Sequence, residues 1–194
     1  MGITEKVIVC DADGVLLDWE YAFDCYANSH GYYKNPAVPP SFHLASAYEV
    51  TSDVMMDMVV RFNESAAVGF LPSVRDSQYW VKKLGTEGYR FHVVSSISDD
   101  PCVRELRIRN LEKLFGKIFN HVECLQIMSS KREYLEKNFG GSGLIWVEDH
   151  AVNCDVGIEV GLKGILVEHG YNMDYSGLAT KVKNWEEIYG IVAK

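Results

Sequence analysis

Positive charge is scarce in this chain of 194 residues: 19 Lys and Arg side chains face 27 Asp and Glu, which gives a formal net charge of −8. A general affinity for nucleic acid or for anionic membranes needs a basic face, so neither is an expected partner. No apolar run approaches the roughly 20 residues that a membrane-spanning helix requires. The sequence also contains no internal repeat and no low-complexity segment.

Cysteine pairs are absent as well. The five cysteines are Cys10, Cys25, Cys102, Cys124 and Cys154. They are scattered, and no two form a C-x-x-C pair, which argues against both a zinc site and a disulfide framework. The first six residues do not have the character of a signal peptide. We therefore expect a reduced, cytoplasmic protein.

What is present is a regular alternation of short apolar runs and helical segments. The runs at 7–10, 90–94, 118–122, 144–147 and 164–167 indicate strands buried on both faces. Helices are expected at 74–84, 100–116, 130–139, 153–161 and from 184 onward. Five strands that alternate with helices predict a three-layer, Rossmann-like α/β fold with a parallel sheet.

The stretch between the first and second strands is too long for a simple crossover. It contains three expected helices, at 18–30, 41–48 and 52–64, with a proline-bearing connector at 34–40. We therefore predict a helical cap domain over 18–73, inserted into a core domain made of 1–17 and 74–194.

Two aspartates, Asp11 and Asp13, directly follow the first strand, and a glycine comes next. One interpretation is an ordinary Asp-Gly turn at the end of a strand. The other is a reactive site, because open α/β sheets bind ligands at the carboxyl ends of their strands. Paired carboxylates there can bind a hard cation, and one can attack while the other moves a proton.

Further polar residues lie directly after other predicted strands or at the start of a predicted helix. Ser95 and Ser96 follow the second strand, and Glu148 and Asp149 follow the fourth. Lys131 lies at the start of a helix, where the helix dipole disfavours a cation. One interpretation is that the lysine side chain reaches toward a bound phosphate. The ordinary alternative is a solvent-exposed surface lysine.

This set, in this order, resembles the haloacid dehalogenase superfamily of phosphohydrolases. Residues 11–14 match its D-x-D-G motif, and 91–95 match its apolar strand ending in Ser or Thr. Lys131 matches its helix-opening lysine, and Glu148-Asp149 matches its terminal acidic pair. The resemblance covers the core and not the cap.

The resemblance implies a mechanism and a cofactor. Asp11 is the expected nucleophile, forming an aspartyl-phosphate, and Asp13 the expected general acid and base. Phosphate would be bound by Ser95, Ser96 and Lys131. The expected Mg²⁺ ligands are the carboxylates of Asp11 and Asp149 and the backbone carbonyl of Asp13, with Glu148 as a direct or water-mediated helper.

A narrower resemblance concerns the substrate. Residues 11–20, 69–72 and 184–188 are similar to the 5′(3′)-deoxyribonucleotidases, which have an aromatic residue where Trp19 stands. Trp19 is then expected to stack on a nucleobase, although it could equally pack the cap. The loop at 97–101 is acidic where that family has a basic residue, which weighs against a nucleotide.

The expected substrate is therefore a small phosphomonoester, most simply a deoxyribonucleoside monophosphate. A phosphatase of sugar phosphates or other small metabolites is the alternative within enzymes. A catalytically silent binding protein is a third hypothesis. The oligomeric state is open, with a homodimer as one option.

Overall fold

The computed structural model describes residues 6–193, so the first five residues of the predicted core segment 1–17 lie outside the described part. Within it, six strands form one parallel sheet in the order β3-β2-β1-β4-β5-β6. The strands are β1 (Lys6–Cys10), β2 (Tyr89–Ser96), β3 (Phe119–Leu125), β4 (Ile145–Glu148), β5 (Lys163–Val167) and β6 (Thr180–Val182). The chain runs outward from β1 in both directions, which creates a switch point between β1 and β4 at the carboxyl edge. The predicted α/β fold is confirmed.

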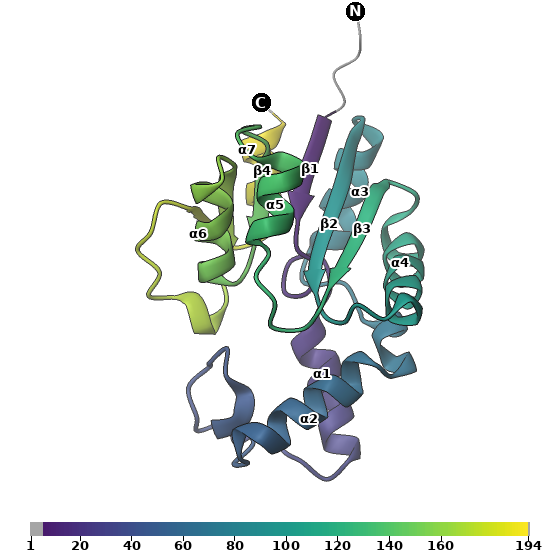
Figure 1. Cartoon of the computed structure of the whole chain (residues 1–194), viewed down its shortest axis with the longest axis vertical. Helices are drawn as coiled ribbons and strands as arrows, with labels where there is room; N and C mark the ends of the chain where they lie inside the picture. The colour runs from purple at the N-terminus through teal and green to yellow at the C-terminus, as the bar shows by residue number, and fades with distance from the viewer. Residues whose placement is uncertain (1–5, 194) are drawn as a thin grey trace, which may run out of the picture.

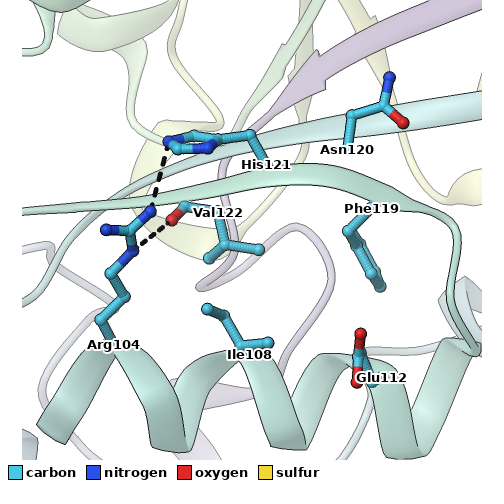
Figure 2. Close-up of a pocket in the computed structure, with 7 residues that line it drawn as sticks. All are labelled: Arg104, Ile108, Glu112, Phe119, Asn120, His121 and Val122. Atoms are coloured by element: carbon cyan, nitrogen blue, oxygen red, sulfur yellow. Dashed lines mark hydrogen bonds between the residues drawn. The ribbon is translucent and has the colours of Figure 1, made fainter. Parts of the chain in front are cut away.

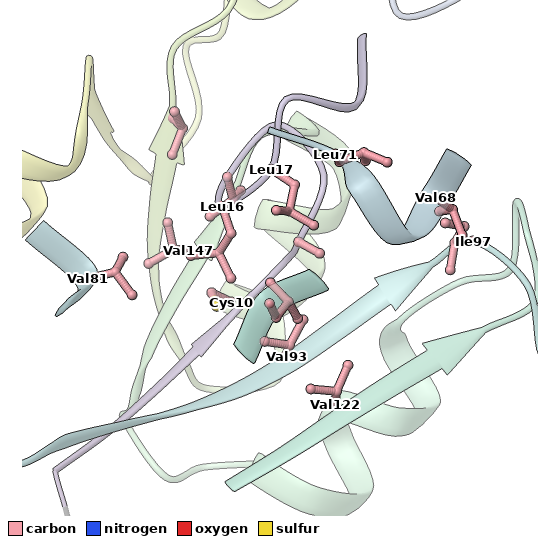
Figure 3. Packing of buried hydrophobic residues seen from close by; sticks show 14 of the residues in the cluster. Cys10, Leu16, Leu17, Val68, Leu71, Val81, Val93, Ile97, Val122 and Val147 are labelled. Atoms are coloured by element: carbon pink, nitrogen blue, oxygen red, sulfur yellow. The ribbon is translucent and has the colours of Figure 1, made fainter. Parts of the chain in front are cut away.

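Side chains of β1 alternate between two apolar layers. Ile8 and Cys10 belong to one buried cluster and Val9 to another. The first cluster contains residues of α3 (Ser77–Thr86), α4 (Pro101–Phe115) and α7 (Trp185–Val192), while the second contains residues of α5 (Arg132–Phe139) and α6 (Ala151–Glu159). Figure 3 shows part of the first cluster, where Val93 and Val147 flank Cys10. Along residues 6–193, no helix is long and apolar enough to cross a membrane.

The predicted cap lies between β1 and α3. It contains α1 (Trp19–Ser29), α2 (Ser52–Asn63) and two short 3₁₀ turns, η1 (Leu44–Ser46) and η2 (Ala66–Phe70). Figure 1 shows α1 and α2 beyond the end of the sheet toward which the strand arrows point. Buried side chains of α1 and α2, among them Phe23 and Phe62, give the cap an aromatic interior. The cap therefore covers the edge at which ligands bind in such folds.

Two elements differ from the sequence-based expectation. The helix predicted over 41–48 is reduced to the three-residue turn η1, because this segment extends toward the core, where Phe42 stacks on His150 at 4.1 Å between ring centroids. The edge strand β6 was not expected, since three residues are too few to show an alternating pattern. Helix boundaries shift by two or three residues: α3 covers 77–86 and α6 covers 151–159.

Candidate active site

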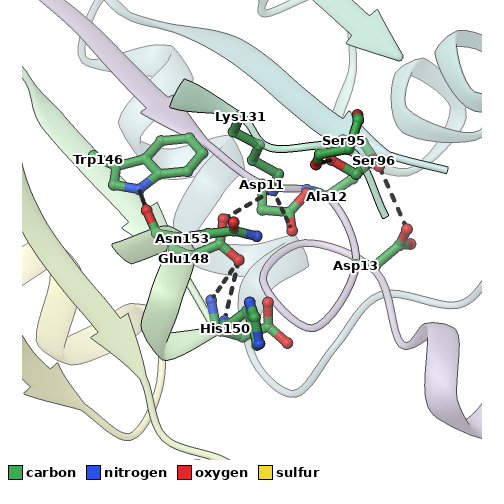
Figure 4. Close-up of polar contacts among 12 residues, drawn as sticks. Asp11, Ala12, Asp13, Ser95, Ser96, Lys131, Trp146, Glu148, His150 and Asn153 are labelled. Atoms are coloured by element: carbon green, nitrogen blue, oxygen red, sulfur yellow. Dashed lines mark hydrogen bonds and ion pairs between the residues drawn. The ribbon is translucent and has the colours of Figure 1, made fainter. Parts of the chain in front are cut away.

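The loop after β1 holds Asp11 at the carboxyl edge of the sheet. The Asp11 N–H donates to the carbonyl of Val147 at 2.9 Å, which extends the pairing of β1 with β4. The chain then turns sharply, because the N–H groups of Leu16 and Leu17 both donate to the carbonyl of Ala12 at 2.8 Å. The Asp11 residue is only 8% exposed, and its carboxylate faces the neighbouring strand ends (Figure 4).

Lys131 lies between two carboxylates. Its Nζ is 2.8 Å from Asp11 Oδ2 and 2.8 Å from Glu148 Oε2, and the residue is 1% exposed. It immediately precedes α5, one position before the helix turn on which the sequence placed it. Burial alone would lower the pKa of Lys131, but the two carboxylates outweigh that effect and the pKa is raised. The lysine is therefore a buried ammonium and not a surface residue.

Glu148, at the end of β4, uses both carboxylate oxygens. Oε2 accepts from Lys131, while Oε1 accepts from the backbone N–H groups of Asp149 at 3.3 Å and His150 at 3.1 Å. The side chain is completely buried. It thus joins the lysine to the turn that carries Asp149.

Asp149 is 6% exposed and has partners from the segment after β5. The Tyr171 hydroxyl donates to Asp149 Oδ2, and the Asn172 side-chain amide donates to the Asp149 carbonyl at 2.7 Å. On the other side Gly14, with φ of +72°, approaches so closely that an added Cβ would lie 2.6 Å from the Asp149 Cγ and closer still to Oδ2. Only glycine suits this position, for reasons of both backbone conformation and space.

The carboxylates of Asp11, Glu148 and Asp149 each offer an oxygen within 4.8 Å of the others. Burial raises the pKa of Asp149 to about 6, and the Asp11 charge adds to the increase. Burial likewise raises the pKa values of Asp11 and Glu148 despite the attraction of Lys131. One ammonium does not compensate three buried carboxylates, so the cluster favours an added cation. Oxygen ligands of this type suit a hard divalent ion.

The two serines predicted to bind phosphate point in different directions. Ser95 is 1% exposed, and its Oγ donates to Asp13 Oδ2 at 3.4 Å, so it belongs to the same group as the two aspartates. The Ser96 hydroxyl instead donates to the carbonyl of Ser129 at 3.4 Å. The structure thus places Ser96 against the loop that precedes Lys131, and its role in binding phosphate stays a prediction.

Sequence reasoning missed the partner of Asp13. Arg107 of α4 donates from Nη1 to Asp13 Oδ1 at 2.6 Å and from Nη2 to Oδ2 at 3.0 Å. The arginine is completely buried. A signal was present in the sequence, because Arg107 interrupts an apolar stripe of i, i+4 spacing formed by Val103, Leu111 and Phe115.

Trp19 opens α1 and packs within the cap. Its ring stacks on Phe23 at 4.8 Å and meets Phe62 edge-on at 5.5 Å, while Nε1 donates to Asn63 Oδ1 at 2.9 Å. These contacts are the ones expected if Trp19 packs the interior of the cap. The indole remains partly exposed, so stacking on a base stays a prediction for this residue.

A cavity of about 230 Å³ lies elsewhere, between α4 and β3 (Figure 2). It is lined by Arg104, Ile108, Glu112, Phe119, Asn120, His121 and Val122. Arg104 crosses it to donate to the Val122 carbonyl at 2.9 Å. None of the predicted site residues lines this cavity.

Comparison with known proteins places the fold. No family model matches the chain, and no curated protein matches it. Among solved structures, a dehalogenase with an intermediate complex is 14% identical, with 100% of both chains covered and a TM-score of 0.62. A haloacid dehalogenase-family hydrolase from Deinococcus radiodurans with bound phosphate and sodium is 16% identical, covering 97% of this chain and 95% of that one, at 0.57. CbbY from Rhodobacter sphaeroides in complex with phosphate is 15% identical, covering 95% and 96%, at 0.61. The chain thus has the haloacid dehalogenase-like fold.

Proposed function

We propose that this chain is a Mg²⁺-dependent phosphomonoester hydrolase that carries the phosphoryl group on Asp11 during turnover. The observation that supports the proposal best is the buried cluster in which Lys131 lies 2.8 Å from both Asp11 and Glu148. A carboxylate that attacks a phosphate dianion needs positive charge beside it, and this cluster provides that charge in a site shielded from water.

Each residue has a defined part in the proposed reaction. A carboxylate oxygen of Asp11 forms a bond to phosphorus as the bond to the leaving oxygen breaks. Asp13 supplies the proton that the leaving oxygen needs. In the second step a water oxygen bonds to phosphorus, its proton passes to Asp13, and the bond from phosphorus to Asp11 breaks, which releases phosphate. Ser95 and Lys131 donate hydrogen bonds to the phosphoryl oxygens, where electrostatic stabilisation provides most of the catalysis.

The donor set fits Mg²⁺. The carboxylates of Asp11 and Asp149 and the backbone carbonyl of Asp13 would hold the ion, since all are hard oxygen ligands. Both oxygens of Glu148 already accept hydrogen bonds, which supports a role in holding Lys131 and the turn after β4. When bound, the ion supplies positive charge for the phosphoryl oxygens.

Structures of similar fold include dehalogenases, so displacement of a halide is the reaction to compare. A halide leaves as a stable anion and needs neither a proton donor nor a divalent cation. An alkoxide leaving group benefits from both. The second carboxylate, Asp13, and the acidic cluster therefore favour a phosphate ester as substrate.

For the ester we propose a deoxyribonucleoside monophosphate, with sugar phosphates as the alternative. Support comes from the aromatic interior of the cap, in which Trp19, at the start of α1, is partly exposed. Stacking on an aromatic side chain is worth about 1–3 kcal/mol for each base.

The direct test is phosphate release from a panel of nucleoside monophosphates, sugar phosphates and p-nitrophenyl phosphate, with and without Mg²⁺. We expect Mg²⁺-dependent hydrolysis that Asp11→Asn abolishes. Asp174→Asn, a change at an exposed aspartate, is the matched control and should retain wild-type rates. Equal rates for wild type and Asp11→Asn, or halide release from 2-chloropropionate with no hydrolysis of any ester, would overturn the proposal. Preference for sugar phosphates would overturn only the nucleotidase part.

A further inference from the structure

A buried arginine binds the carboxylate that the proposed reaction uses for proton transfer. Both oxygens of Asp13 accept hydrogen bonds from Arg107, in the bidentate geometry that fixes a carboxylate in orientation as well as in position. The Asp13 side chain is 23% exposed, and its other hydrogen bond is the long one from Ser95 at 3.4 Å, so Arg107 provides most of what fixes its orientation.

The position of Arg107 is itself fixed at the junction of core and cap. One turn further along α4, the Asn110 side chain exchanges two hydrogen bonds with the backbone of Leu71, at 3.1 and 3.0 Å. Leu71 directly follows η2, where the cap returns to the core. One residue before the arginine, Leu106 packs against Gly69 so closely that an added Cβ there would lie 3.0 Å from it. These contacts hold α4, and with it Arg107, against the cap junction.

Burying Arg107 also has an unfavourable free energy, because one of its hydrogen-bond donors has no partner. Among the described residues, its Nε is the one buried side-chain nitrogen or oxygen without a hydrogen-bond partner. Buried polar groups in proteins nearly always have partners, so an exception calls for a reason. An apolar residue at position 107 would complete the apolar stripe of α4 and would leave no buried N–H without a partner.

We propose that Arg107 is a positioning residue that holds Asp13 in place for hydrolysis of the aspartyl-phosphate, an inference that rests on the proposed function. A carboxylate offers about four lone pairs. Arg107 occupies two of them. When the Ser95 hydroxyl donates to a phosphoryl oxygen, the remaining lone pairs of the fixed carboxylate are free to accept a proton from water. In this step the water oxygen bonds to phosphorus, its proton passes to Asp13, and the bond between phosphorus and Asp11 breaks.

The proposal predicts that the two chemical steps respond differently to loss of the arginine. With p-nitrophenyl phosphate the leaving group departs as a stable anion, so formation of the phosphoenzyme depends little on Asp13. Arg107→Met should therefore show a burst of p-nitrophenol equal to the enzyme concentration, followed by turnover slowed at least about tenfold. Arg107→Lys, which keeps the charge but has a single donor nitrogen and so loses the bidentate geometry, should lie between this variant and wild type.

The control is Arg109→Met on the same helix, since the Arg109 side chain is exposed and pairs only with Glu105 among the described residues. It should behave as wild type. Arg107→Met in an Asp13→Asn background should add little further loss, because both changes remove the same interaction. The double variant also lacks the Asp13 charge that Arg107→Met alone leaves unpaired, so it remains informative if Arg107→Met folds poorly.

The inference would be overturned, with the function left intact, by equal slowing of both steps or by full additivity with Asp13→Asn. Unchanged turnover in Arg107→Met would do the same. Absence of any phosphoenzyme in the wild-type protein would instead contradict the proposed function itself. Burst kinetics by stopped flow, with thermal unfolding of each variant, separates these results.

Discussion

Replacing Gly14 with alanine should displace Asp149 and thereby weaken metal binding. An alanine Cβ at this position would lie 2.6 Å from the Asp149 carboxyl carbon, whereas ordinary contacts begin at 3.4 Å. The carboxylate must retreat by roughly 1 Å, a displacement that can lower a catalytic rate about 100-fold. The φ of +72° adds a backbone cost of about 1–2 kcal/mol.

The backbone cost can be separated from the contact with Asp149. Gly88 has a similar φ of +88°, and an added Cβ there meets nothing within 4 Å. Gly88→Ala should therefore lower the melting temperature by about 2–8 °C through backbone strain alone. It should leave Mg²⁺ affinity and kcat/KM unchanged.

The assay is Mg²⁺ binding by titration calorimetry, with kcat/KM for the best ester and thermal unfolding of both variants. The expected result is a large loss of Mg²⁺ affinity and of activity in Gly14→Ala only. If Gly14→Ala binds Mg²⁺ as tightly as Gly88→Ala does, Asp149 is not the ligand that the proposed site requires, and the reasoning is wrong.

Three further predictions concern the charges and the cap. Lys131→Met leaves two buried carboxylates without their counter-ion, so urea unfolding should show a loss of about 3–5 kcal/mol; a change near zero would show that the lysine is dispensable for stability. Because burial raises the pKa of Asp149 from 3.8 to about 6, and also raises those of Asp11 and Glu148, the folded metal-free protein binds more protons than the unfolded chain across this range. Its unfolding free energy should therefore fall as pH rises from about 4 through about 8, and Mg²⁺ should restore it. Urea unfolding of the metal-free protein tests this, and a stability that rises over this pH range would contradict an excess of buried carboxylates. Trp19→Ala should raise KM more for nucleoside monophosphates than for p-nitrophenyl phosphate, whereas equal effects would leave the indole a packing residue.

The sheet and the position of the site follow from the sequence because strand signals are local. Each buried run is recognisable alone, and parallel strands bring their carboxyl ends to one edge. Residues that follow different strands, such as Asp11, Ser95 and Asp149, could therefore be expected to converge. The direction of each side chain could not, because it depends on partners distant in the chain. Ser96 is the example, since its hydroxyl bonds to the loop before α5.

Residues that act from helices were harder to predict. Arg107 lies in a segment with other arginines, and only its place on the apolar stripe distinguishes it. Tyr171 belongs to a short segment after β5 that has no strand or helix signal, and its bond to Asp149 depends on the tertiary fold. The segment at 41–48 was expected to be helical, but contacts of Phe42 with the core outweigh its local preference.

The central claim is that Asp11 carries a phosphoryl group during turnover. It is tested most directly by acid quenching of the Mg²⁺-loaded protein while it hydrolyses p-nitrophenyl phosphate, followed by mass spectrometry of the intact chain and its peptides. The expected result is a mass gain of one phosphoryl group located at Asp11 and absent from Asp11→Asn. Hydrolysis without a modified Asp11, or with the phosphoryl group on another residue, would contradict the account.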